Sequence, residues 1–142
     1  VDAVVIQSGH ILLVQRKFAP GRGLWALPGG FINPTESQED AVIRELREET
    51  KIKVPVPVLR GSIVKEKTFS DPKRSERGRT FTQEYLIQLD DNQALPKVKG
   101  SDDAKHAEFI PLAQFYDMAE EMFEDHYHII KIMLARLPKE NR

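Results

Sequence analysis

The sequence predicts an α+β fold in which helices cover both faces of a mixed β-sheet, an α/β/α sandwich. Short β-rich runs alternate with stretches of helical periodicity, and tight turns as well as longer crossovers join neighbouring runs. The 142 residues show no internal repeat and no linker long enough to divide them. We therefore expect one domain over residues 1–138, followed by a short tail at 139–142.

The N-terminal part reads as strands separated by turns. Runs at 3–7 and 11–16 flank Ser8 and Gly9, which predicts a hairpin. Residues 19–23 form a loop by composition, and a short apolar strand at 24–27 stops at the Pro-Gly-Gly that follows it.

The strongest helix signal covers residues 36–50. Thr35 is a good N-cap, and Glu36, Glu39 and Asp40 lie in the first turns, where the helix dipole favours anions. Ile43, Leu46 and Thr50 are expected to face the sheet.

The remaining elements follow from proline placement, alternation and helical spacing. We expect an edge or connector at 54–58, a strand at 58–69, a cationic loop at 70–79, a strand at 80–89, a polar loop at 90–103, a strand at 108–110, a short helix at 111–118 and an amphipathic helix at 119–137.

Composition excludes several classes of protein. With 21 basic and 22 acidic residues, no net charge attracts the chain to nucleic acid or a membrane, and we expect neither partner. No cysteine is present, so disulfides, thiol nucleophiles and cysteine-based zinc sites are excluded. No apolar run is long enough to span a membrane. We expect a soluble, cytoplasmic domain.

The helix carries a carboxylate cluster. Glu48 and Glu49 lie one turn on from Glu45, so the spacing predicts one negative face near the helix C-terminus. These carboxylates repel one another, and the helix dipole disfavours anions near its C-terminus. A divalent cation would offset both effects. A solvated face, neutralised in part by Arg44, Arg47 and Lys51, is the alternative.

A glycine turn precedes this helix. Gly29 and Gly30 allow the backbone to approach a ligand closely, whereas an isolated pair of glycines indicates only a tight turn. Facing a carboxylate helix, the turn could add backbone carbonyls to carboxylate oxygens, the ligands that hard cations prefer.

These residues resemble the Nudix box. Gly30 is followed after five residues by Glu36, and after seven more by Arg-Glu-Leu-Arg-Glu-Glu-Thr-Lys-Ile at 44–52. The one departure is Lys51, where the family has glycine, and we expect it to alter the helix exit without abolishing metal binding. The resemblance implies a Nudix-type α/β/α sandwich.

Segments 23–32, 56–63, 77–80 and 124–127 also resemble the C-terminal Nudix domain of bifunctional nicotinamide mononucleotide adenylyltransferase/Nudix proteins. This resemblance implies a covalently linked N-terminal nucleotidyltransferase domain before Val1, in a longer protein. It also implies ADP-ribose as substrate, in NAD metabolism. The downstream proline of many ADP-ribose hydrolases has only Pro72 as a counterpart, so the substrate assignment rests on these relatives.

The family implies Mg²⁺, for which Mn²⁺ can substitute, held by Glu45, Glu48 and Glu49. A backbone carbonyl of Gly29 or Gly30 is expected as a further ligand. Arg44 is expected to orient the carboxylates and Glu36 to be structural. The general base stays open among the acidic candidates, which are Glu45, Glu84, Asp102 and Asp103.

Substrate contacts are expected from cations and aromatics. Arg77 and Arg79 suit bidentate phosphate binding, although a solvated basic loop is the alternative. Phe31 is the preferred adenine-stacking residue, with Phe18 and Trp25 as further candidates, Trp25 being a more typical core residue. His126 and His128, on the terminal helix, are expected to be structural.

Family behaviour thus implies Mg²⁺-dependent hydrolysis of ADP-ribose to AMP and ribose 5-phosphate. A second hypothesis keeps this chemistry for a nucleoside triphosphate, an oxidised nucleotide or a dinucleoside polyphosphate. A third is a non-catalytic ADP-ribose sensor, which the intact Glu45, Glu48 and Glu49 disfavour.

Overall fold

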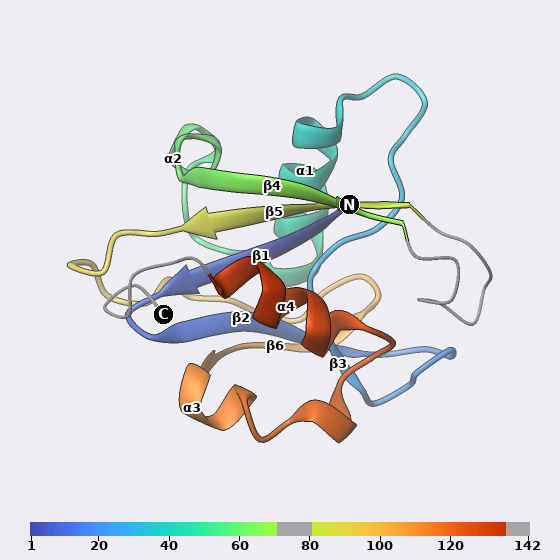
Figure 1. Ribbon diagram of the computed structural model, residues 1–142. Helices are drawn as coiled ribbons and strands as arrows, with labels where there is room; N and C mark the ends of the chain where they lie inside the picture. Colours follow the sequence, from blue (N-terminus) through green and yellow to red (C-terminus); the bar gives the residue numbers. More distant parts are fainter. Residues whose placement is uncertain (71–80, 136–142) are drawn as a thin grey trace.

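The computed structural model describes residues 1–70 and 81–135 (Figure 1). Its strands are β1 (Asp2–Gln7), β2 (His10–Arg16), β3 (Trp25–Ala26), β4 (Ile63–Phe69), β5 (Thr82–Gln88) and β6 (Ala104–Pro111). Its helices are α1 (Gln38–Thr50), α2 (Val56–Gly61), α3 (Leu112–Phe115) and α4 (His126–Leu134), with a 3₁₀ turn, η1, at Ala119–Glu121.

The strands form a mixed sheet, as the sequence predicts. β1 runs parallel to β5, with Val4 opposite Leu86, and the other strand pairs are antiparallel. β6 pairs along the whole of β2, so β1 and β3 share the other edge of β2, one at each end. Where they meet, Asp2 of β1 lies opposite Gly29.

Helices cover both faces of this sheet, which confirms the sandwich (Figure 1). Alternate residues of β1 point to opposite faces. Ala3 and Val5 belong to the cluster packed under α1, whereas Val4 and Ile6 belong to the cluster packed under α4. All four are fully or almost fully buried. β1 therefore lies at the centre of the fold, and its first residues reach the glycine turn.

The predicted start of α1 is wrong by about half a turn. Ser37, not Thr35, is the N-cap, and its side chain accepts a hydrogen bond from the Asp40 N–H at 3.1 Å. Glu36 lies before the helix, where its carboxylate accepts from the Asn33 N–H at 2.8 Å. Ile43, Leu46 and Thr50 are buried, as expected.

The helix exit keeps its left-handed turn. Lys51 has φ 50° and ψ 32°, and its N–H donates to the Arg47 carbonyl at 3.0 Å. This is the backbone region that glycine adopts without strain. The lysine therefore adopts the backbone conformation of the usual glycine, which leaves its backbone locally strained.

Two further boundaries differ from the expectation. Residues 56–61, expected as connector and strand, form α2, because Pro57 falls in the first helical turn, where its missing N–H costs nothing. The strand at 108–110 extends to 104–111 because every residue from His10 to Gln15 has a partner on it.

The predicted helix at 119–137 is interrupted. η1 ends at Glu121, Met122 pairs with Trp25 of β3, and Glu124 takes a positive φ of 46° before α4 begins. Pairing with β3 overrides the local helical pattern over this stretch. The predicted end of the helix and the tail at 139–142 lie outside the described residues. In the described part of the chain, no helix is long and apolar enough to cross a membrane.

Candidate active site

Glu49 joins α1 to the glycine turn. Its side chain is buried, with 8% of the residue exposed, and its Oε1 accepts the Gly29 N–H at 2.7 Å. Asp2 and Gly29 form a non-hydrogen-bonded pair, flanked by bonds from Ala3 N to Pro28 O and from Gly30 N to Val1 O. The Gly29 amide and carbonyl are consequently turned away from β1. This turn presents Gly29 to the helix.

Both glycines are required by close approach. A Cβ on Gly30 would lie 2.6 Å from the Glu45 carboxyl carbon, and one on Gly29 would collide with Val1 and Asp2. The Gly30 carbonyl accepts a hydrogen bond from the Val1 nitrogen at 2.9 Å. Of the two carbonyls proposed from the sequence as ligands, Gly29 is therefore the better placed.

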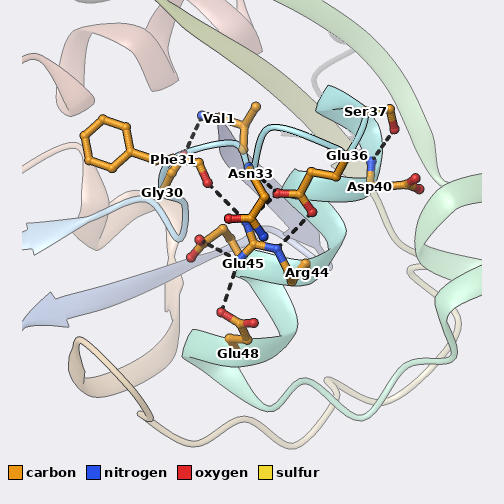
Figure 2. A network of polar contacts seen from close by, with 10 residues as sticks. All are labelled: Val1, Gly30, Phe31, Asn33, Glu36, Ser37, Asp40, Arg44, Glu45 and Glu48. Atoms are coloured by element: carbon orange, nitrogen blue, oxygen red, sulfur yellow. Dashed lines mark hydrogen bonds and ion pairs between the residues drawn. The ribbon is translucent and has the colours of Figure 1, made fainter.

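Arg44 holds the other two carboxylates (Figure 2). Its Nη1 donates to Glu45 Oε1 at 2.9 Å and to Glu48 Oε2 at 3.3 Å. Its Nε and Nη2 donate to both oxygens of Glu36, at 3.0 and 2.6 Å. Figure 2 shows Arg44 between Glu36 on one side and the other two glutamates on the other. This geometry fits the predicted orienting role of Arg44 and the structural role of Glu36.

The electrostatics differ along the cluster. Burial raises the pKa of Glu49 to about 8, against the lowering effect of the Gly29 hydrogen bond, and the charges of Glu45, Asp2 and Asp103 raise it further. Burial also raises the pKa of Glu45, against the opposing effect of Arg44. Arg44 lowers the pKa of Glu36 to about 2. Negative charge is thus concentrated around buried Glu49.

A cleft of about 510 Å³ opens beside Glu49 and the glycine turn. Phe31 and Phe18, 81% and 56% exposed, line it, as expected for base-stacking candidates. Trp25 does not line it and packs against the core, with its ring edge-on to His106. Figure 2 shows the Phe31 ring pointing away from the polar network.

The base candidates are separated by the fold. Asp103 lines the cleft and is exposed, and its charge acts on Glu49. Asp102, also exposed, acts on Glu45 from a left-handed backbone position. Glu84 is fully buried in β5, opposite Asp2. The cleft therefore favours Asp103.

The sequence reasoning overlooked Asp2 and Arg16. Asp2 lines the cleft, and its signal was a lone charge within an apolar strand. Arg16 also lines it, with its Nε donating to Pro20 O at 2.7 Å and its guanidinium 4.0 Å from the Phe123 ring centroid. Arg77, Arg79 and Pro72 lie outside the described residues.

The site's fit to a divalent cation follows from its donor atoms. Within residues 1–70 and 81–135, no group of three or more His, Asp or Glu side chains is arranged to hold a metal as it stands. Arg44 engages Glu45 and Glu48, and Glu49 faces Gly29. The chemistry nevertheless fits, because carboxylate oxygens surround a buried carboxyl group whose pKa a cation would lower.

Comparison with known proteins finds relatives that match over most of this chain. An ADP-ribose pyrophosphatase of Methanocaldococcus jannaschii is 36% identical over 131 residues, covering 92% of this chain and 69% of the relative. A bifunctional NMN adenylyltransferase/ADP ribose pyrophosphatase of Francisella tularensis, solved with AMP and a manganese ion, matches with TM-score 0.91 and 45% identity. That match covers 94% of this chain but only 40% of the bifunctional protein.

A further solved structure is the NUDIX domain of Shewanella oneidensis NrtR in complex with ADP ribose. It matches with TM-score 0.75 and 28% identity, covering 96% of this chain and 86% of that domain. The NUDIX domain family matches residues 1–132, which include β1 to β6, the glycine turn and α1. On this evidence, the chain belongs to the Nudix domain family.

Proposed function

We propose that this Nudix domain hydrolyses the diphosphate of ADP-ribose, with water, to AMP and ribose 5-phosphate in NAD metabolism. The observation that carries the proposal is the buried Glu49 bound to Gly29 in a cleft lined by Phe18 and Phe31. The pyrophosphatases of Methanocaldococcus and Francisella narrow the substrate to ADP-ribose. For the whole protein, a linked nucleotidyltransferase domain is part of the proposal.

The proposed cofactor is Mg²⁺, with Mn²⁺ able to replace it. Glu45, Glu48 and Glu49 would hold it, with the Gly29 carbonyl as a further ligand. The manganese ion in the Francisella structure supports a divalent cation. When bound, the cation would neutralise the diphosphate charge that otherwise repels a nucleophile.

The chain's own residues supply orientation and proton transfer. Arg44 fixes the Glu45 and Glu48 carboxylates through its two bonds from Nη1. Asp103 accepts the proton of the attacking water as the water oxygen bonds to phosphorus and the bridging P–O bond breaks. Both phosphates leave as separate products, so the atoms of one water are distributed between them.

Substrate contacts complete the proposal. Phe31 stacks on adenine and Phe18 supports it from the same cleft. Arg16, held by Pro20 and Phe123, brings a positive charge toward the diphosphate. Arg77 and Arg79 are proposed to bind phosphate as well.

An ADP-ribose sensor is the second candidate. The observation that favours it is the similarity to the NrtR domain that binds ADP ribose. A sensor would bind ADP-ribose saturably without turnover, whereas the hydrolase would release products.

Product analysis separates these functions. The protein is incubated with Mg²⁺ and either ADP-ribose, a nucleoside triphosphate, an oxidised nucleotide or a dinucleoside polyphosphate, and binding is measured by calorimetry without metal. AMP and ribose 5-phosphate, formed fastest from ADP-ribose, support the proposal. Binding without turnover supports the sensor. Faster turnover of another nucleotide would overturn the choice of substrate.

A further inference from the structure

We infer that His126 is a positioning residue for the glycine turn, and through it for the Glu49–Gly29 contact. Its ring is buried, with 7% of the residue exposed, and it lines the same cleft as Glu49 and Gly29. Its Nδ1 accepts the Leu27 N–H at 3.0 Å. The imidazole therefore binds the backbone two residues before Gly29.

The bond from Leu27 to His126 takes the place of a backbone hydrogen bond in the ladder between β3 and the segment before α4. The segment before α4 runs along the outer edge of β3, where Met122 pairs with Trp25 in parallel and the Phe123 N–H donates to Trp25 O at 2.8 Å. In a parallel ladder, the next donor, Leu27 N–H, would bind the Phe123 carbonyl. That carbonyl instead accepts from His126 N at 3.1 Å. The imidazole supplies the acceptor that the backbone no longer offers.

The turn is consequently held from both faces of the sheet. His126, the first residue of α4, binds Leu27, and Glu49 of α1 binds Gly29 at 2.7 Å. The Phe123 ring and the imidazole pack in a T-shaped arrangement, with centroids 5.5 Å apart and planes at 82°. Leu27 is itself 3% exposed. The stretch from Leu27 to Gly29 is therefore held at both of its ends.

The bond also fixes the tautomer. Since Nδ1 accepts, the neutral imidazole carries its hydrogen on Nε2. An asparagine places its amide oxygen close to the Nδ1 position, whereas a glutamine places its oxygen close to Nε2. The Asn and Gln variants therefore distinguish a need for an acceptor at the Nδ1 position from a need for any polar side chain. The Leu variant removes the acceptor and keeps a side chain of similar size.

The test compares His126→Leu, His126→Gln and His126→Asn, with His128→Leu as a control at an exposed position of the same helix. Amide hydrogen exchange at Leu27 and Gly29 is followed by NMR, and Mn²⁺ affinity is measured without nucleotide. We expect Leu and Gln to speed exchange at both amides and weaken Mn²⁺ binding roughly 10–100-fold, as for other residues that orient metal ligands. The Asn variant should bind Mn²⁺ with nearly the affinity of the unchanged protein, because it keeps an acceptor at the Nδ1 position.

A kinetic arm rests on the proposed function. In ADP-ribose hydrolysis, Leu and Gln should lower kcat about tenfold or more with KM little changed, and Asn should rescue it. Normal exchange and Mn²⁺ affinity in folded Leu or Gln variants would overturn the inference, as would an Asn variant that behaves like Gln. If His126→Leu fails to fold, the comparison of the Asn variant with the Gln variant tests the inference. If ADP-ribose is not hydrolysed, exchange and Mn²⁺ affinity still decide.

Discussion

Glu36 holds Arg44 through two parallel hydrogen bonds, from Nε at 3.0 Å and from Nη2 at 2.6 Å. This fork leaves Nη1 directed at Glu45 and Glu48. Glu36 also accepts from the Asn33 N–H, and Arg44 donates to the Phe31 carbonyl. The spacing of glutamate and arginine in the Nudix box therefore connects the loop after the glycine turn to the helix that carries the carboxylates.

This pair makes stability depend on pH. Arg44, together with the hydrogen bond from the Asn33 N–H, lowers the pKa of Glu36 from its ordinary value of 4.5 to about 2. A depressed carboxyl pKa contributes stability that is complete above pH 4.5 and lost as the pH falls toward 2. Glu36→Gln should therefore unfold at a lower temperature than the unchanged protein at pH 7, and the gap should close between pH 4.5 and 2. Glu120→Gln, at an exposed position, is the control, and a gap that does not depend on pH would contradict this reading.

Lys51 offers a stabilising change. Its backbone is left-handed, a conformation that costs an L-residue with a Cβ about 1–2 kcal/mol. Lys51→Gly should raise the free energy of unfolding by about 1 kcal/mol, partly offset by unfolded-chain entropy, and Tm by about 2–4 °C. Lys51→Ala keeps the strain and should gain nothing. Equal effects of both variants in thermal unfolding would argue against strain at this position.

The glycine turn should not tolerate a side chain at Gly30. The added Cβ of Gly30→Ala would displace the Glu45 carboxyl, and an ångström-scale shift costs up to about 10²-fold in rate. Gly61→Ala is the matched control, because its Cβ meets nothing within 4 Å. We expect steady-state hydrolysis to fall only in the first variant while both fold. Full activity of Gly30→Ala would show that Glu45 needs no fixed position.

Asp103 and Asp102 can be separated by single amide substitutions. Asp103→Asn should lower kcat about 10²- to 10⁴-fold in steady-state hydrolysis, the range for loss of a positioned base. Asp102→Asn, one residue away and outside the cleft lining, should have a much smaller effect. The reverse order would move the base to the Asp102 side, next to Glu45.

Local sequence signals predict much of the fold. Alternation places β1, β2 and β5 within about two residues, and the carboxylate helix within two. The missed features depend on long-range pairing. Met122 leaves the helical pattern because it pairs with Trp25, and β6 is longer than its apolar core because β2 extends it.

The candidate site residues remain a prediction from the sequence, and their geometry could not be predicted from it. Helical periodicity places Glu45, Glu48 and Glu49 near one another. It does not reveal that Glu49 is buried and bound to Gly29 while the Glu48 side chain stays 43% exposed. The approach of Asp2 to Gly29 and the bond from Leu27 to His126 join segments far apart in the sequence, which no local pattern encodes.

The most direct test of the central claim is ADP-ribose hydrolysis by the unchanged protein and by Glu49→Gln, measured side by side with Mg²⁺. Glu39→Gln, on the first turn of α1 and outside the cleft lining, is the control. Loss of several kcal/mol of charge stabilisation corresponds to roughly 10²- to 10³-fold in rate. We predict AMP and ribose 5-phosphate from the unchanged protein and from the control, and a loss of that size in Glu49→Gln. Unimpaired hydrolysis by a folded Glu49→Gln would contradict the account.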